Sequence, residues 1–137
     1  ISVRGTVMAL DFIAILAYLA GILDGEGTIY LRRRGRNVDF RVAVSMTDRE
    51  PLDLFQKTFG GGVVHYDVPK GGNKGVFRWA ISSSGAERAL SALAPYLFIK
   101  KRKAQIALAS RSFGRLNRWT PNDIFERREQ LLAGWAS

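Results

Sequence analysis

The chain has 137 residues, no cysteine and a single histidine, and these shortages exclude several classes of protein. Without cysteine, the chain can form neither disulfides nor thiolate-based zinc sites. With His65 as the only histidine, a metal cluster built on histidines is excluded as well. The sequence also lacks a glycine-rich phosphate-binding loop and the elbow that carries a serine nucleophile.

Acidic residues are few as well: 12 Asp and Glu stand against 21 Lys and Arg, which gives a formal net charge of +9. This balance indicates a polyanionic partner, because Lys and Arg neutralise phosphates and release their counterions. The length corresponds to about one domain, and the hydrophobic fraction of 47% indicates a globular protein with a real core. We therefore expect one domain over residues 1–137 with a polyanion as its partner. Membrane binding and a charge that serves only solubility are the alternatives.

A long uninterrupted apolar run is also missing. Asp11 interrupts the apolar N-terminal segment, and Asp24 and Glu26 close it. A membrane-spanning helix needs about 20 apolar residues without such breaks. We expect an intracellular protein that does not bind membranes. A basic protein anchored to a membrane through residues 7–23 is the alternative.

Helical and strand-like segments follow one another along the chain. Asp11 is a suitable N-cap for a helix, and 47–50 and 84–87 have the spacing of capping boxes. The expected elements are a helix over 12–24, strands over 27–34 and 39–46, a helix after 47–50, strands over 63–68 and 76–82, a helix after 84–87, and helices over 100–111 and from 120 onward. This order predicts an α+β domain, αββαββα, with extra C-terminal helices and an antiparallel sheet.

The first expected hairpin has two unlike faces. Ile29, Leu31, Phe40, Val42 and Val44 point to one side, because side chains alternate along a strand. The opposite side is polar and basic. One face should cover the core while the other faces solvent.

The stretch over residues 19–27 reads LAGILDGEG and joins the first helix to the first strand. Gly21 and Gly25 stand four apart, so they share one helical face on which another backbone can approach closely. Glu26 follows at the helix end, where unpaired carbonyl groups carry partial negative charge. A carboxylate there needs a cation beside it. The combination indicates two crossed helices that present two carboxylates to a divalent metal.

This stretch is similar to the signature of the LAGLIDADG homing endonucleases. Gly25 replaces an alanine and Glu26 replaces the usual second aspartate, while the matching positions are Leu19, Ala20, Gly21, Asp24 and Gly27. The resemblance implies the αββαββα fold and a site-specific endonuclease that hydrolyses both strands of DNA with Mg²⁺, or another divalent cation such as Mn²⁺. It implies cleavage across the minor groove of an intron or intein insertion site.

The chain has one copy of the motif, so the glycine face must meet a copy of itself. Such an interface is isologous, and it makes the expected DNA target long and nearly palindromic. We expect a homodimer joined through Gly21, Leu23 and Gly25.

The resemblance also implies roles for single residues. Glu26 should bind the metal, with the carbonyl of Gly25 as a possible further ligand. Lys100 should order or activate the hydrolytic water, with Lys101 as an open alternative, and Asp48 should orient solvent. Each residue also has an alternative interpretation without a catalytic role. Glu26 would be an exposed acid, Lys100 a solvated surface charge and Asp48 a helix cap.

DNA reading is expected on the polar face of the sheet, since a two-stranded ribbon fits the major groove. Lysines in the second turn should contact phosphates, which position the protein without specifying sequence. The expected DNA-binding residues are Tyr30, Arg32, Arg34, Arg36, Asp39, Arg41 and Ser45, then His65, Asp67 and Arg78, with Lys70 and Lys74 on phosphates.

A non-cleaving relative is the alternative function: an RNA maturase or a transcriptional regulator that keeps the same fold. Glu26 and Lys100 together favour the enzyme, because a pure binding module needs neither residue.

Overall fold

The computed structural model describes residues 3–34, 37–68, 71 and 75–116. Its elements are α1 (Val3–Glu26), β1 (Gly27–Arg34), β2 (Asn37–Met46), α2 (Glu50–Phe59), β3 (Val63–Asp67), β4 (Val76–Ser82), α3 (Ser83–Leu93), the 3₁₀ helix η1 (Ala94–Tyr96) and α4 (Lys101–Leu116). The predicted αββαββα order is confirmed, and α4 is an added C-terminal helix. The helix expected from residue 120 lies outside the described residues.

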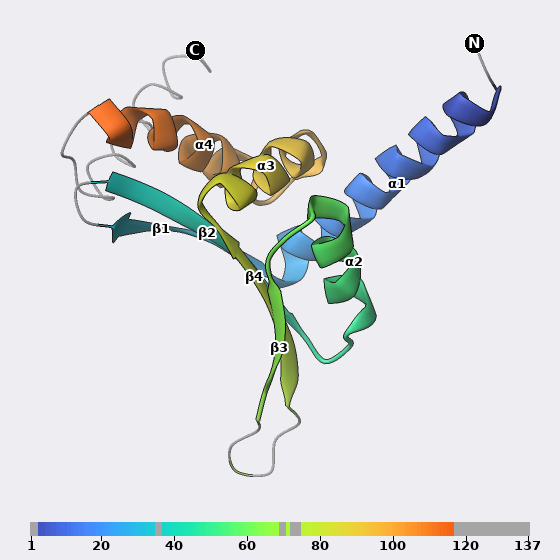
Figure 1. Cartoon of the computed structure of the whole chain (residues 1–137), viewed down its shortest axis with the longest axis horizontal. Helices are drawn as coiled ribbons and strands as arrows, with labels where there is room; N and C mark the ends of the chain where they lie inside the picture. The colour runs from blue at the N-terminus through green and yellow to red at the C-terminus, as the bar shows by residue number, and fades with distance from the viewer. Residues whose placement is uncertain (1–2, 35–36, 69–70, 72–74, 117–137) are drawn as a thin grey trace.

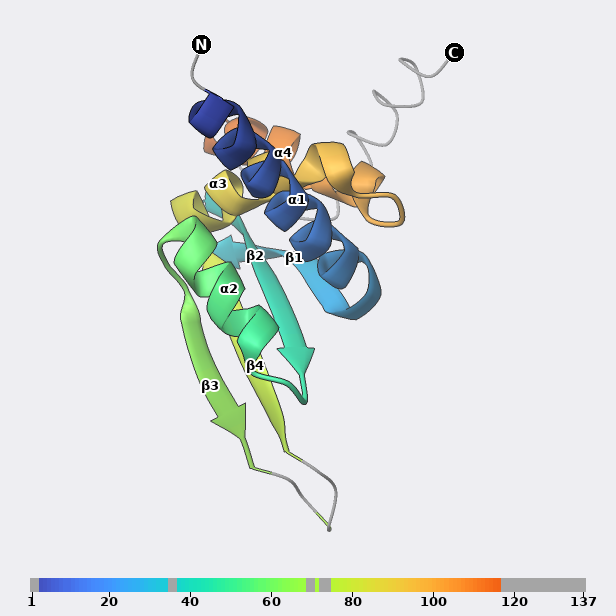
Figure 2. The same ribbon diagram turned by 90° about the vertical axis from the view of Figure 1, so that its right-hand side faces the viewer.

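The four strands form one antiparallel sheet in the order β1-β2-β4-β3. All four α-helices lie on the same side of this sheet (Figure 1). In Figure 1, the N-terminal half of α1 extends away from the sheet. Figure 2, turned by 90°, shows α1 and α2 in front of the strands. The other face of the sheet is therefore left uncovered by any described helix.

The covered face carries the core. Ile29, Phe40 and Val42 are fully buried there, as the alternation of the first hairpin predicted. From β4, Trp79 stacks on Phe55 of α2 with ring centroids 4.8 Å apart. The indole Nε1 of Trp79 also donates a hydrogen bond to the main-chain oxygen of Gly61. The only polar atom of this buried ring therefore has a hydrogen-bond partner.

The predicted capping boxes are wrong. The N-cap residue of α2 is Arg49 and that of α3 is Ser82, and neither helix has a side-chain cap hydrogen bond. At α3 the reason is geometric, because β4 pairs up to Ser82 and the helix follows at once, which leaves no loop for a box. Helix α2 ends at its C-cap residue, Gly60, whose φ of 66° lies in the left-handed region that favours glycine.

Helix α1 starts at Val3, so the prediction that Asp11 caps it is also wrong. Asp11 is exposed on the helix, where an acidic side chain costs only a few tenths of a kcal/mol, roughly, relative to better helix formers. No helix among the described residues combines the length and hydropathy needed to cross a membrane.

Candidate functional site

One face of α1 is an open strip of small residues. Gly21 and Gly25 are exposed on it, and a Cβ added at either would meet no atom within 4 Å. Ala14 and Ala17 continue the exposed small residues toward the N-terminus, and the larger Tyr18 is exposed between them and Gly21. Nothing in the described part of a single chain fills this strip, so a second backbone could approach it closely.

Leu23 does not belong to the open strip. It is 0% exposed and packs in the hydrophobic core, against the sheet side of α1. The expected contact of Leu23 with a partner subunit is therefore wrong. Two residues along a helix correspond to a rotation of about 200°, which turns Leu23 away from Gly21.

Glu26 is the last residue of α1, and its side chain is exposed. It makes no hydrogen bond or ion pair with any described residue. Its carboxylate is therefore available to an external cation at the electronegative end of the helix. β1 begins at the next residue, Gly27, so Glu26 lies where the helix meets the sheet.

Asp24, two residues earlier, ties this helix end to a distant loop. Its carboxylate accepts hydrogen bonds from the backbone N–H groups of Phe98, at 2.8 Å, and Lys100, at 3.0 Å. Burial by itself would raise the pKa of Asp24, but backbone hydrogen bonds from Phe98, Lys100 and Ile99, together with the charge of Lys100, hold this pKa below its usual value. Asp24 is therefore a structural acid that stays ionised.

Lys100 is drawn to the same helix end. Its Nζ donates a hydrogen bond of 2.6 Å to the main-chain oxygen of Asp24. A cation at a helix C-terminus is favourable, because the last carbonyl groups carry partial negative charge. The neighbouring Lys101 is exposed and is the first residue of α4. The geometry thus brings Lys100, rather than Lys101, beside the motif that contains Glu26.

Asp48 lies in the turn after β2 and is exposed. Gly27 pairs with Val44, so the end of β2 lies beside the start of β1. Asp48, just after β2, and Glu26, just before β1, are therefore at the same end of the sheet. Helix capping does not account for Asp48, because α2 has no side-chain cap.

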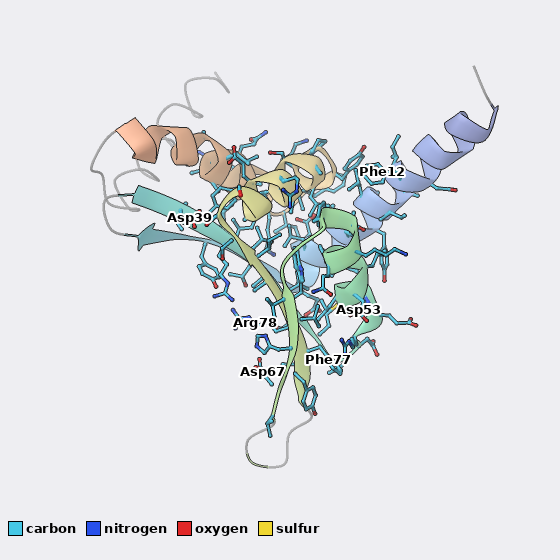
Figure 3. All side chains as sticks on the ribbon, viewed as in Figure 1. Phe12, Asp39, Asp53, Asp67, Phe77 and Arg78 are labelled. Carbon is cyan, nitrogen blue, oxygen red and sulfur yellow. The ribbon has the colours of Figure 1, made fainter. Side chains whose placement is uncertain are left out.

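The uncovered face of the sheet holds most of the expected DNA-reading residues that are described. Figure 3 shows Arg78 and Asp67 on the opposite side of the sheet from Phe77 and Asp53. His65 and Asp67 are exposed there, with His65 Nε2 3.1 Å from Asp67 Oδ1. Tyr30, Arg41, Ser45 and Arg78 are half-buried. The side chains of Arg32 and Arg34, and all of Arg36, Lys70 and Lys74, lie outside the described set.

Asp39 departs from this group. It is only 7% exposed, and its Oδ2 accepts a hydrogen bond of 2.7 Å from Ser83 Oγ. Ser83 has a φ of 60°, which is uncommon for a residue with a side chain. The expected role of Asp39 as a base reader is corrected: its carboxylate holds the start of β2 against the start of α3.

The sequence analysis did not predict that the two central strands present equivalent residues on the uncovered face. Residues 40–45 read FRVAVS and residues 77–82 read FRWAIS, so phenylalanine, arginine, alanine and serine recur in the same places. Comparing the sequence with itself would have found this signal. The repeat adds Ala43, Ala80 and Ser82 to the uncovered face.

A metal site cannot be completed by the described residues of one chain. They contain no group of three or more His, Asp or Glu side chains that could hold a metal ion. A single free carboxylate, Glu26, fits a cation such as Mg²⁺ that keeps several waters and takes its other ligands from substrate phosphates.

Comparison with known proteins places this architecture. No protein-family model matches the sequence, and no curated protein is significantly similar to it. Among solved structures, the homing endonuclease I-CvuI bound to its target with calcium has 23% identity and a TM-score of 0.60, over 73% of this chain and 67% of that one. The chain has the LAGLIDADG homing-endonuclease fold.

Two further LAGLIDADG-type structures agree. The LAGLIDADG meganuclease I-AabMI, bound to uncleaved DNA, has 18% identity and a TM-score of 0.58 over 74% of this chain and 38% of that one. The intron-encoded homing endonuclease I-CeuI, complexed with DNA, has 18% identity and a TM-score of 0.55 over 70% of this chain and 53% of that one. This chain thus spans about half or less of these two proteins and 66% of I-CvuI in its complex with the I-CreI target.

Proposed function

We propose that this protein is a metal-dependent, site-specific DNA endonuclease that cuts both strands as a homodimer. The observation that carries the proposal is the open glycine strip of α1 ending at a free carboxylate, Glu26. The LAGLIDADG fold supports it, because the neighbours with this fold were solved as complexes with DNA. The net charge of +9 supports a DNA partner independently.

The open strip supports a homodimer. Two α1 helices that cross at Gly21 and Gly25 would fill the space that one chain leaves open. A two-fold interface is isologous, so each helix would bring its own Glu26 to the same end of the crossing. The two sheets would then form a single long saddle, and the target would be a long, nearly palindromic site of the kind found at intron or intein insertions.

The chemistry is metal-assisted phosphodiester hydrolysis. Glu26 would hold the divalent cation, Mg²⁺ or Mn²⁺, with the carbonyl of Gly25 as a further ligand. A cation bound there makes a water molecule a better nucleophile and offsets charge on the leaving oxygen.

Other residues position the reactants. Lys100, held by the main-chain oxygen of Asp24 at 2.6 Å, places a positive charge beside the scissile phosphate and orients water. Asp48 supplies a second solvent-orienting carboxylate at the same end of the sheet. Arg41, Arg78 and their neighbours on the uncovered face read bases in the major groove, while Lys70 and Lys74 contact phosphates. The protein works inside the cell, where its target DNA is.

The test is to select cleaved sites from random double-stranded DNA with Mg²⁺, comparing wild type with Glu26→Gln. We expect Glu26→Gln to bind the selected site with unchanged affinity. It should cut that site more slowly by at least the roughly 10- to 100-fold that loss of a group behind a metal ligand costs, because here the ligand itself is lost. Asp53→Asn is the matched control, because it removes an exposed carboxylate from α2 on the covered face. Chelation of the metal should abolish cutting by wild type.

Equal cutting by wild type and Glu26→Gln would remove Glu26 from the mechanism. Binding without cutting by the wild-type protein would instead favour the alternative, a non-cleaving relative that assists RNA splicing or controls transcription.

A further inference from the structure

The two central strands of the sheet carry the same pattern, F-R-Φ-A-Φ-S, where Φ is an apolar residue. It occupies Phe40–Ser45 in β2 and Phe77–Ser82 in β4. Alternation places the apolar positions Val42 and Ile81 in the core. The arginine, alanine and serine of each copy consequently project from the uncovered face.

The strand register relates the two copies by a local two-fold axis. In the antiparallel pair, Ala43 faces Ala80, Arg41 faces Ser82 and Ser45 faces Arg78. Rotation by half a turn about the alanine pair therefore exchanges the two arginines and the two serines. We call these six residues the two-fold block.

The same symmetry extends to the outer strands. In the order β1-β2-β4-β3, the central strands exchange with each other and so do the outer ones. Tyr30 of β1 faces Arg41, and His65 of β3 faces Arg78. Each arginine thus has, on its outer side, a ring that carries a polar atom.

The two arginines are also equivalent in their surroundings. The Nε atoms of Arg41 and Arg78 are both buried, and neither has a hydrogen-bond partner among the described residues. Ala43 is 5% and Ala80 is 8% exposed, and their short side chains leave room for the arginine stems to lie along the sheet. A buried donor without a partner costs free energy, so the two arginines share the same unsatisfied environment as well as the same place in the register.

We propose that the two-fold block reads a short inverted repeat within each half of the DNA target, with Arg41 and Arg78 each binding a guanine on opposite strands. This inference rests on the proposed function for DNA binding, and it adds which bases are read. Arg pairs in bidentate fashion with the O6 and N7 atoms of guanine in the major groove. Duplex DNA has local two-fold axes, so a symmetric reader meets equivalent groups on the two strands.

The register also gives a spacing. Arg41 and Arg78 are offset by four residues along the strand direction, since Arg78 faces Ser45. At a rise of about 3.3 Å per residue this offset is about 13 Å. It corresponds to about four base-pair steps at roughly 3.4 Å each. The half-site should therefore hold G and C about four steps apart, in the order G…C or C…G on one strand.

The shape of the nucleic-acid grooves makes B-form DNA a better partner for this sheet than RNA. The major groove of B-form DNA admits a two-stranded ribbon, whereas that of an A-form RNA helix is too narrow and deep for side chains to read. A nearly palindromic target would then contain a smaller palindrome inside each half-site.

The test is selection of bound sites from random double-stranded DNA with Ca²⁺, using the full chain as wild type, Arg41→Gln and Arg78→Gln. Wild type should enrich a G and a C about four steps apart within each half-site. Each variant should lose about ten- to a hundredfold discrimination at one position of the pair, a different position for each. Arg49→Gln is the control of equal charge change, because Arg49 is exposed beside α2 and pairs with Asp53.

Two results would overturn the proposal while DNA binding stands. One is that both variants relax the same position. The other is that both weaken binding evenly across all sequences, as loss of a phosphate contact would. Thermal unfolding of each variant shows that it is folded. Failure of wild type to enrich any DNA, or enrichment of RNA instead, would overturn the DNA-reading function as well.

Discussion

The open strip on α1 predicts opposite effects of one substitution on the subunit and on the dimer. In Gly21→Ala, the new methyl group meets no atom within 4 Å in a single chain, so the subunit has no steric cost. Glycine in a helix interior is about 1 kcal/mol less favourable than alanine. We therefore expect the isolated subunit to become more stable by about 1 kcal/mol.

The dimer should respond in the other direction. The same methyl group enters the position where two backbones are proposed to touch, and overpacking of a close contact costs about 1–3 kcal/mol. A two-fold interface contains the substitution twice, so the loss is about 2–6 kcal/mol per dimer. The dissociation constant of the dimer should consequently rise by more than about tenfold.

Sedimentation over a range of protein concentrations measures the dimer, and urea unfolding at dilution measures the subunit. Gly27→Ala is the matched control within the motif, because its added Cβ would clash with the side chain of Leu23 and lie 2.7 Å from the Leu23 carbonyl oxygen. That variant should destabilise the subunit. The reasoning would be refuted if Gly21→Ala dimerised as wild type does, or lowered the stability of the subunit.

Three further predictions concern Asp24, Lys100 and the core. Asp24→Asn should lower the free energy of unfolding by about 1–2 kcal/mol at neutral pH. The folded-state pKa of Asp24 is depressed, so this stabilisation is present above pH 4, roughly, and the difference from wild type should vanish as the pH falls through the folded value. Lys100→Met should bind DNA and lose cutting, whereas Lys101→Met should cut normally; the reverse result would exchange their roles. Trp79→Ala should lower the free energy of unfolding in urea by about 3–5 kcal/mol, and a loss below 1 kcal/mol, roughly, would contradict the stacking on Phe55.

The element order and the two faces of the sheet could be predicted because the signals are local. Ile29, Phe40 and Val42 alternate with polar residues, and the pleat of a strand converts that alternation directly into a buried and a free face. The spacing of Gly21 and Gly25 on one helical face was equally local, and both glycines are exposed. Helix boundaries were less well predicted, because side-chain caps at Asp11 and at 47–50 compete with backbone geometry that depends on neighbouring elements.

Long-range contacts were decided by the tertiary structure. The sequence did not distinguish Lys100 from Lys101, and only packing placed the Nζ of Lys100 on the carbonyl oxygen of Asp24. Packing likewise buried Asp39 against Ser83. It also aligned Ala43 with Ala80, which turned a repeated hexapeptide into a symmetric surface.

The sequence by itself thus determined which segments are helices and strands, which faces are apolar, and where the motif stands, because each of these depends on residues a few positions apart. The tertiary structure alone decided that Asp24 is tied by hydrogen bonds, that Lys100 contacts it and that Arg41 and Arg78 occupy equivalent places on the sheet. Those outcomes depend on contacts between residues that are distant in the chain, and no local pattern specifies such contacts.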